Sequence, residues 1–320
     1  MKKIFFLAVN TAMTKHNEIT ERYIKFYDER ASEKLYCSIV GNVVIPNGYP
    51  TNSNTPIISN NKLWKELATR INSKGTRPGI QLASTWPTYE GQRNFISREN
   101  SLETYRSYME GINQRTIQSI FSNLYLASRM SIDFGFKHIQ LHAGHGYLFN
   151  LLIEPVFTSF HDLIMEKLEE WLFFLKKNNI ESSIRVSLVT GNLDIDKALE
   201  ISNLIPKLSP DYYDLSDGFY NIDKKLIYPY SKNIECRKNR QIDISNTYIQ
   251  QKFISSGLSY GLYDEEILPD NLHIGICRDL IASPNFLNFP NEKGCSKCSK
   301  CHYYSRGKSE LECPKWDEKY

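Results

Sequence analysis

Residues 138–148 read His-Ile-Gln-Leu-His-Ala-Gly-His-Gly-Tyr-Leu, a short apolar run followed by polar residues and two glycines. The run has the length of a buried strand, and glycines directly after it allow a sharp turn. In a closed barrel of alternating strands and helices, side chains at the C-terminal strand ends face the active site. We therefore expect His142, His145 and Tyr147 to meet in one site, where imidazoles and a phenol can donate hydrogen bonds or a proton. Taken alone, His-x-x-His also fits a zinc pair or two hydrogen-bonded loop histidines.

On both sides of this stretch, short apolar runs alternate with longer segments of helical period. Strands are predicted at Ile4–Val9, Leu35–Gly41, Gly79–Leu82, His138–His142, Ser183–Leu188, Tyr212–Leu215, Ile242–Ser245 and Leu272–Ile276. Amphipathic helices are predicted at Asn61–Ser73, Arg115–Phe134, His161–Lys177 and Ile195–Ile205. This alternation implies a parallel sheet, and eight units in 320 residues favour a closed α/β structure, the (β/α)8 TIM barrel, over an open sheet. Within 216–260 no clean period is present, so only a loop and the seventh strand are predicted there.

The composition is that of one large folded domain. Apolar residues make up 41% and charged residues 23% of the chain, and the net charge is +3. This small charge and the lack of a dense Lys/Arg stripe give no reason to expect nucleic acid as a partner. The apolar run Ile4–Val9 is shorter than a signal peptide requires and suits a strand, and no run reaches the roughly 18 residues that span a membrane. We therefore expect a cytoplasmic protein without a membrane partner.

Four of the seven cysteines gather near the C-terminus, with the spacing Cys295-x2-Cys298-x2-Cys301-x11-Cys313. Crowded cysteines in a reducing compartment indicate a metal site rather than disulfides. Three closely spaced thiolates and a distant fourth favour a [4Fe–4S] cluster, and zinc is the alternative. The tail has no apolar period of its own, so we divide the chain into a barrel at residues 1–290 and a metal-binding extension at residues 291–320.

The run at 142–148 resembles the His-x-x-(His/Asn)-Gly-Tyr-Leu segment that follows the fourth strand in the Old Yellow Enzyme family of flavin-dependent ene-reductases. The resemblance implies an FMN-binding barrel that reduces an activated C=C bond of a small molecule. It implies that His142 and His145 bind the electron-withdrawing group of the substrate above the flavin. Tyr147 would donate the proton, and flavin N5 would supply the hydride, which is the chemistry of the cofactor.

Residues at the ends of further strands match the flavin-ring contacts of that family in their order. Ala8 and Thr11 correspond to an Ala-Pro-Met-Thr segment after the first strand, and Gly41 corresponds to a small residue packed against the ring. Gln81 corresponds to a glutamine that pairs with the pyrimidine edge. Arg185 corresponds to an arginine that neutralises charge at flavin N1 and O2, which stabilises the reduced ring.

Residues 277–284 (Cys-Arg-Asp-Leu-Ile-Ala-Ser-Pro) resemble the phosphate-binding Gly-Arg-x-Leu-(Ile/Leu)-Ala-Asp-Pro segment of that family. The resemblance implies that Arg278 and backbone amides, including that of Cys277, hold the FMN phosphate. The chain departs from the family pattern in several places, among them Ser84, which stands where the family has the histidine of Gln-Leu-x-His, and a shorter spacer between Pro284 and Cys295. Cys277 replaces a glycine, Asn246 stands for the glycine of the seventh strand, and the Arg-x-Asp-x-Tyr-Gly-Gly-Ser segment is absent. These departures predict a divergent member with an unusual substrate.

The cysteine spacing is similar to that of the trimethylamine dehydrogenase and 2,4-dienoyl-CoA reductase branch, in which a cluster exchanges single electrons with FMN. Those relatives continue into further nucleotide-binding domains, whereas this sequence ends at Tyr320. We therefore expect electrons to come from NAD(P)H at the FMN or from an external electron-transfer protein at the cluster. Two other functions stay open: a dehydrogenase or demethylase that passes electrons out through the cluster, and a non-catalytic barrel with a zinc-bound tail. An oligomer is compatible with the sequence.

Overall fold

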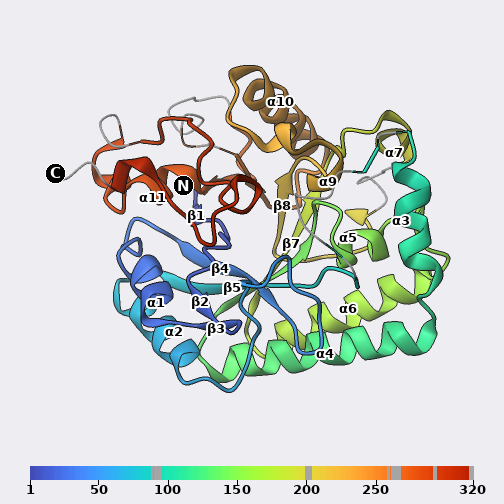
Figure 1. Cartoon of the computed structure of the whole chain (residues 1–320), viewed down its shortest axis with the longest axis horizontal. Helices are drawn as coiled ribbons and strands as arrows, with labels where there is room; N and C mark the ends of the chain where they lie inside the picture. The colour runs from blue at the N-terminus through green and yellow to red at the C-terminus, as the bar shows by residue number, and fades with distance from the viewer. Residues whose placement is uncertain are drawn as a thin grey trace.

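The computed structural model describes residues 1–87, 89, 96–97, 99–198, 204–257, 260, 268–290 and 294–316. Eight strands close into a barrel in which every neighbouring pair is parallel (Figure 1). In their order around the barrel they are β1 (Ile4–Phe6), β4 (Cys37–Val44), β5 (Arg77–Ala83), β6 (His138–Ala143), β7 (Glu181–Ser187), β8 (Tyr212–Ser216), β9 (Phe253–Ser255) and β10 (Leu272–Ile276). The predicted (β/α)8 barrel is confirmed. A hairpin of β2 (Thr14–Lys15) and β3 (Glu18–Ile19) follows β1.

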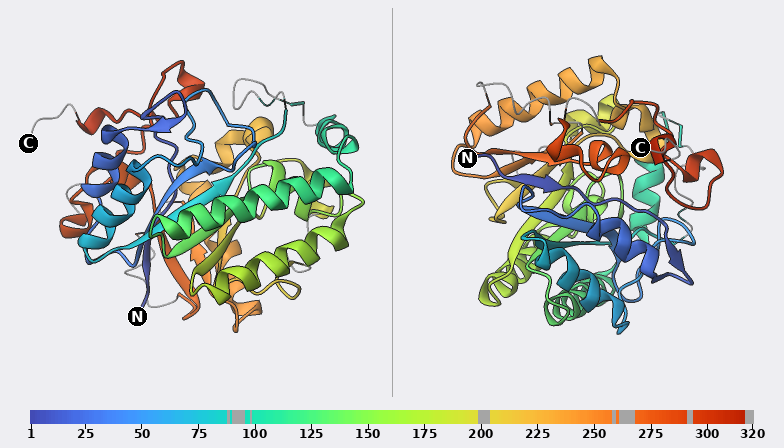
Figure 2. Two further views of the ribbon diagram at one scale, coloured as in Figure 1. Left: turned by 90° about the horizontal axis from the view of Figure 1, so that it is seen from below. Right: turned by 90° about the vertical axis from the view of Figure 1, so that its left-hand side faces the viewer.

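Helices cover the outside of the barrel, as the two views of Figure 2 show. They are α1 (Glu21–Asp28), α2 (Leu63–Ser73), α3 (Ser101–Glu110), α4 (Gln114–Asp133), α5 (Leu148–Ile153), α6 (His161–Lys177), α7 (Leu193–Ala198), α9 (Tyr220–Asp223), α10 (Ser231–Thr247) and α11 (Arg278–Ala282). The predicted helices overlap α2, α4, α6 and α7. Part of the predicted helix Ile195–Ile205, at residues 199–203, lies outside the described residues.

The long helices form where a polar cap precedes an apolar stripe. In α4 the side chain of Asn113 accepts a hydrogen bond from the Thr116 amide (3.0 Å), which satisfies a donor of the first turn. Ile117, Phe121 and Leu124 follow at helical spacing and are buried. All residues of β4 and of β6 are buried, because side chains of one face fill the barrel and those of the other face meet the helices.

The predicted position of the seventh strand is wrong. Ile242–Ser245 belongs to α10, and the strand at this place in the barrel is β9, which begins eight residues after Ser245. The buried face of α10 is polar: Arg237, Gln241 and Ser245 recur at helical spacing and are 3%, 1% and 0% exposed. A helix whose inner face is polar has no apolar period, so the sequence pattern did not reveal it. Asn246, predicted for the end of this strand, lies in α10 as well, and Gly257 follows β9 instead.

The C-terminal tail, residues 294–316, packs across the carboxyl-end side of the barrel next to α11 (Figure 1). The Leu311 amide donates to the Thr11 carbonyl (2.9 Å), and the Trp316 indole donates to the Ile281 carbonyl (2.7 Å). On the surface Arg22 pairs with Glu310 at 2.7 Å. These contacts join the tail to the segments after β1 and β10, whose ends form the mouth of the barrel.

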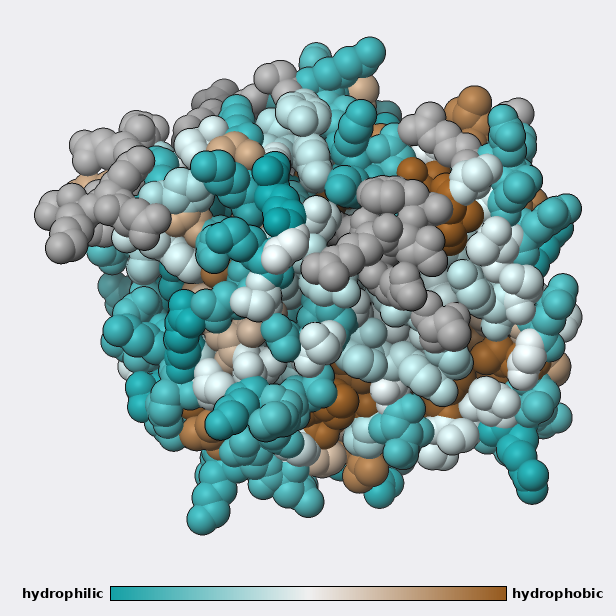
Figure 3. Space-filling model, viewed as in Figure 1, coloured by the Kyte–Doolittle hydropathy of each residue, from teal (hydrophilic) through white to brown (hydrophobic). Residues whose placement is uncertain are grey.

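Hydrophilic side chains cover most of the face in Figure 3, and apolar ones lie between them in small patches. Among the residues that the structure describes, no helix combines the length and the apolar character that crossing a lipid bilayer would need.

Candidate active site

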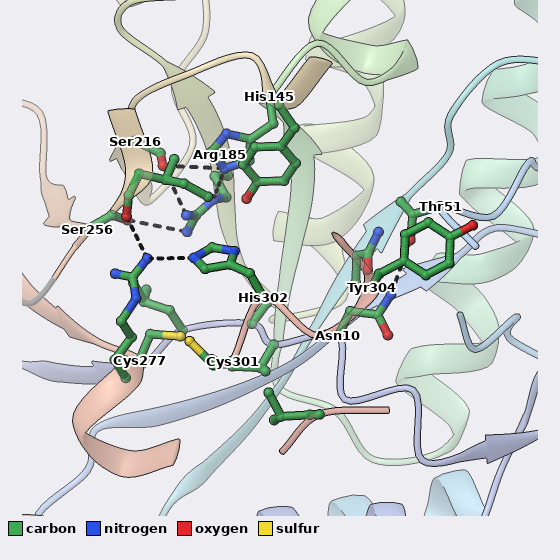
Figure 4. Close-up of a pocket in the computed structure, with 18 of the residues that line it drawn as sticks. Asn10, Thr51, His145, Arg185, Ser216, Ser256, Cys277, Cys301, His302 and Tyr304 are labelled. Atoms are coloured by element: carbon green, nitrogen blue, oxygen red, sulfur yellow. Dashed lines mark hydrogen bonds between the residues drawn. The ribbon is translucent and has the colours of Figure 1, made fainter. Parts of the chain in front are cut away.

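A cavity of about 220 Å³ lies at the carboxyl ends of the barrel strands, where a site is expected (Figure 4). It is lined by these predicted site residues: Ala8, His145, Tyr147, Arg185, Cys277, Arg278 and the tail residue Cys301. Other predicted residues do not line it: Thr11, Gly41, Gln81, His142, Cys295, Cys298 and Cys313. The structure therefore brings residues from strands that are far apart in the sequence into one cavity.

The turn after β6 holds His145 in place. His145 and Gly146 both adopt left-handed backbone (φ 62° and 75°), and a Cβ at Gly146 would lie only 2.7 Å from the Phe219 ring. The His145 Nδ1 atom is bonded to the Gly218 carbonyl at 2.8 Å. Because a carbonyl only accepts, Nδ1 carries the proton and Nε2 is the acceptor, with the Arg185 Nε atom 3.4 Å away.

Both histidines are held neutral, and the tyrosine is held protonated. Burial and then Arg185 lower the pKa of His145 to about 3, while burial and then His145 lower the pKa of His142 well below its usual value. Burial, followed by the nearby Tyr89, raises the pKa of Tyr147. The His142 ring lies 4.7 Å from the Tyr147 ring, and among the described residues its buried Nδ1 has no partner. A neutral imidazole and a phenol are groups that can bind and protonate an uncharged substrate.

The titration of His145 predicts a pH dependence of stability. The pKa in the folded protein, about 3, lies below the unfolded value of 6.5, so the unfolded chain binds the extra proton. The contribution of the neutral His145 imidazole to the free energy of unfolding is complete above pH 6.5 and is lost as the pH falls toward 3. The free energy of unfolding should fall between pH 7 and pH 5 in the unaltered protein. In His145→Asn we expect this fall to be smaller than in the unaltered protein, by up to about 2 kcal/mol. Urea denaturation at both pH values measures it.

Asparagine is the suitable replacement because it tolerates left-handed backbone. His16→Asn is the matched control, since His16 is exposed and also adopts left-handed backbone (φ 52°). An unchanged pH dependence in His145→Asn would mean that the imidazole titrates normally in the folded protein.

Aromatic residues that the sequence did not single out close the cavity beside the histidine. The Tyr220 ring stacks on the His145 ring with 4.1 Å between centroids and an angle of 14°. Tyr89 meets the Tyr147 ring edge-on at 5.5 Å, and both phenols line the cavity. Ser216 ends β8 and is followed by Asp217 and Gly218; this polar triplet, two residues before Tyr220, was the available signal for a functional loop. The wall suits a flat, unsaturated ligand.

Arg185 on β7 points into a polar network. It pairs with the carboxylate of Asp214 on β8 at 2.6 Å, and it donates to the hydroxyls of Ser216 (3.1 Å) and Ser256 (3.3 Å). Figure 4 shows the contacts with the two serines and with His145. The Gln81 amide donates to Gln140 at 2.6 Å, so Gln81 is linked to the barrel interior.

Thr11 and Gly41 support the site from behind. Thr11 is fully buried, and its hydroxyl accepts from the Met13 amide at 3.3 Å. Gly41 has φ 135°, and a Cβ there would lie 3.0 Å from the Gln81 carbonyl oxygen. Glycine is thus required at this position by close packing against β5, whether or not a ligand is bound.

Two more arginines, Arg278 and Arg237, line the same cavity. Arg278 follows β10, donates to the Ile227 carbonyl (2.5 Å) and approaches the His302 ring at 3.4 Å, a contact drawn in Figure 4. Among the described residues, no hydrogen-bond partner reaches the buried Nε atom of Arg278. At Gly257 (φ 94°) a Cβ would lie 2.0 Å from the Arg237 guanidinium, so only glycine leaves this cation room against the backbone. Arg237 is itself paired with the buried carboxylate of Asp217 at 3.4 Å, so the unpartnered donor of Arg278 is the feature here that fits an anionic group such as phosphate.

Tail residues form part of the cavity wall, which the sequence did not predict. His302, Tyr303 and Tyr304 follow Cys301 directly and line the cavity with it. In Figure 4 the Cys277 and Cys301 side chains point toward each other, and both thiols are free. Within the described part of the chain, no three His, Cys, Asp or Glu side chains are arranged to hold a metal ion.

The fold and the site together define a class of protein: a (β/α)8 barrel whose mouth holds one cavity lined by arginines together with histidine and tyrosine side chains. No protein-family model and no curated protein matches the sequence. Solved structures share the fold.

One of them is a complex of 2-naphthoyl-CoA reductase with 2-naphthoyl-CoA, with a TM-score of 0.71 and 15% identity, covering 98% of this chain and 56% of that one. Another is Old Yellow Enzyme from Pichia sp. AKU4542, with a TM-score of 0.64 and 15% identity, covering 89% of this chain and 82% of that one. The chain spans little more than half of the length of the naphthoyl-CoA reductase. At this identity the likeness establishes the shared barrel.

Proposed function

We propose that this protein is an FMN-dependent oxidoreductase that reduces an activated C=C or a related unsaturated bond of a small molecule. The observation that carries the proposal is a single cavity that holds Arg185 and Arg278 together with His145 and Tyr147. Cationic groups suit the phosphate and the reduced ring of a flavin, and the imidazole and phenol suit an electron-poor substrate. The barrel shared with an Old Yellow Enzyme and a CoA-ester reductase supports the same class of reaction.

The residues proposed for the FMN site are Ala8, Thr11, Gly41, Gln81, Arg185, Cys277 and Arg278. Ala8, Arg185, Cys277 and Arg278 line the cavity and would contact the cofactor, whereas Thr11, Gly41 and Gln81 lie behind its wall and would support these contacts. Arg278 would hold the phosphate, and Arg185 would face the pyrimidine edge. The cavity, at about 220 Å³, is smaller than the roughly 300–1,000 Å³ of common cofactor pockets. Side chains at its wall, such as Tyr220 and Tyr304, therefore have to move for three fused rings to enter. When bound, FMN supplies the hydride-transfer chemistry that no side chain provides.

The side chains themselves bind the substrate and deliver a proton. Tyr147, whose raised pKa keeps it protonated, is the proposed proton donor to the substrate carbon. His142 and His145 are the residues proposed to bind the electron-withdrawing group. For this contact His145 would have to release the Gly218 carbonyl or take the other tautomer, because its Nε2 atom only accepts. His142, whose Nδ1 atom has no partner among the described residues, does not line the cavity, so the cavity wall would have to open for this histidine to reach a substrate. The 2-naphthoyl-CoA in the similar reductase is an aromatic acyl ester, and the tyrosine-rich wall here suits a substrate with a flat unsaturated group.

For the tail we propose a [4Fe–4S] cluster on Cys295, Cys298, Cys301 and Cys313, with zinc as the alternative metal. The support is the cysteine spacing in the sequence and the chemistry of four free thiols in one short extension (residues 291–320) that follows the barrel (residues 1–290). The thiols would have to converge on the metal, because the described residues do not hold three ligands in position for one. A reducing cytoplasm would keep these thiols available. Electrons would come from NAD(P)H at the flavin or from an external carrier protein at the cluster.

Anaerobic purification followed by a visible spectrum tests the proposal. We expect flavin bands that remain in the supernatant after denaturation, and iron with acid-labile sulfide in the protein. Removing the metal with a chelator should weaken FMN retention, because Cys301 is followed directly by three residues that line the cavity. A colourless protein without flavin would contradict the FMN proposal, and zinc without iron would replace the cluster while leaving the flavin proposal intact.

The direction of the reaction is tested by stopped-flow mixing with NAD(P)H. Fast bleaching of the flavin band would support a reductase. Reduction by substrate alone, followed by electron loss to an external acceptor, would instead identify a dehydrogenase.

A further inference from the structure

Asp214 is a carboxylate that the proposed chemistry does not use, and it lies directly behind the proposed flavin contact. It stands in the middle of β8 and is fully buried. Its Oδ2 atom pairs with Arg185 Nη1 at 2.6 Å. Arg185 lines the cavity, whereas Asp214 does not. The guanidinium that would face the flavin is therefore one half of a buried ion pair.

Every contact of Asp214 orients it toward Arg185 and its neighbours. The Gln140 amide donates to Oδ2 at 3.1 Å, and the Ser256 hydroxyl donates to Oδ1. Gln140 in turn accepts from Gln81 at 2.6 Å. The two side chains assigned to the flavin pyrimidine edge, Gln81 and Arg185, are thus joined through Gln140 and Asp214. Asp214 both positions these groups and carries a charge beside them.

That charge changes what Arg185 does electrostatically. Burial lowers the pKa of Arg185, but Asp214, together with the nearby Tyr220 and Cys277, raises it, and the net shift is upward, so the guanidinium stays charged. An isolated cation would attract negative charge at the cavity strongly, since a buried site screens charges less than water does. A cation with a carboxylate at 2.6 Å acts as a dipole, and its attraction falls off much faster with distance.

We propose that Asp214 holds down the reduction potential of the bound flavin by neutralising Arg185. The inference rests on the proposed FMN site. Two-electron reduction with uptake of one proton leaves a negative charge on the pyrimidine side of the ring. A compensated arginine stabilises this charge less than a free one, so the reduced cofactor is a stronger donor of hydride. Such a poise suits substrates that are hard to reduce, which includes conjugated and aromatic acyl groups.

The test is Asp214→Asn in the FMN-loaded protein. Asparagine keeps an oxygen for Arg185 and Gln140, and it places an amide next to the Ser256 hydroxyl, so the shape is kept and the charge is lost. Sulfite adds to flavins more tightly when positive charge lies near the pyrimidine edge, which makes sulfite a direct probe. We expect its dissociation constant to fall about tenfold and the two-electron potential to rise by about 30 mV, the equivalent of a tenfold change.

Asp211→Asn is the matched control. It removes the same charge at the start of the same strand, where Asp211 accepts from the Ser182 amide at 2.8 Å, away from the mouth of the barrel. Sulfite affinity and potential should stay at the values of the unaltered protein. Asp214→Ser serves as a second neutral variant if Asp214→Asn does not fold.

The outcomes separate this inference from the function it rests on. Absence of flavin in the unaltered protein would refute the FMN site itself. Flavin bound normally, with sulfite affinity and potential unchanged in the neutral Asp214 variants, would refute only the role of Asp214. A change of equal size in Asp211→Asn would also refute it, because the effect would then reflect net charge rather than the ion pair.

Discussion

Replacing Tyr147 by Phe is expected to slow substrate reduction by roughly 10²- to 10⁴-fold, the usual contribution of a positioned general acid. The change removes one hydroxyl from a ring that is 6% exposed and packed against His142 and Tyr89. The ring contacts stay, so FMN should remain bound and its reduction by NAD(P)H should keep its rate. Stopped-flow measurement of the two half-reactions separates these effects, since only reoxidation by the substrate needs the proton.

Tyr213→Phe is the control for losing a buried phenol elsewhere. Tyr213 lies on β8 and donates to the Leu208 carbonyl (3.1 Å) on the outside of the barrel. The Tyr213→Phe substitution should lower the stability of the protein without a specific effect on the reoxidation of the flavin by substrate. A Tyr147→Phe protein that is reoxidised at the normal rate would remove Tyr147 from the role of proton donor.

The second large effect is expected for cofactor retention in Arg278→Leu. This change removes the guanidinium whose Nε atom lacks a partner among the described residues, so the proposed phosphate end of the cavity loses a buried cation. We expect the FMN dissociation constant to rise by about 10²-fold or more, because truncating one partner of a buried charge pair costs about 2–5 kcal/mol. Titration of the apoprotein with FMN, followed by flavin fluorescence quenching, measures this.

Arg278→Lys keeps a charge and should lie between the two proteins, since lysine lacks the planar fork that binds phosphate in a bidentate way. The leucine variant also loses the hydrogen bond to the Ile227 carbonyl (2.5 Å), so its melting temperature without FMN must be compared with that of the lysine variant. Equal FMN affinity in the unaltered protein and in Arg278→Leu would show that the phosphate does not bind at Arg278.

Much of the fold was predictable because it depends on local patterns. Short apolar runs predicted strands that overlap the observed ones, with the exception of β9, and helical period predicted α4 and α6 within one residue of their observed ends. The failure at β9 has a clear cause. The neighbouring helix α10 buries the polar side chains of Arg237 and Gln241. The Gln241 amide donates to the Leu215 carbonyl at 2.9 Å. Such a helix is stabilised by specific hydrogen bonds, which hydrophobic periodicity does not detect.

The site was predictable in part. His145 and Tyr147 come shortly after β6 and line the cavity at the mouth of the barrel, a position that strand direction alone predicts. Gln81 lies within a strand, and only its contact with Gln140 shows that it is directed into the interior. Tyr304 reaches the cavity from the tail, more than 200 residues after β4, and no local pattern predicts such a contact.

The sequence by itself determined the alternation of strands and helices, the polar residues at the strand ends and the cysteine spacing of the tail. Each of these features depends on residues that are close together along the chain, so the period and the spacing of residue types are enough to predict it. Only the tertiary structure decided which of these residues share a cavity, that Arg185 is neutralised by Asp214, and that the tail covers the mouth. Those facts arise from contacts between distant segments, whose energies depend on distance and burial after the barrel has closed.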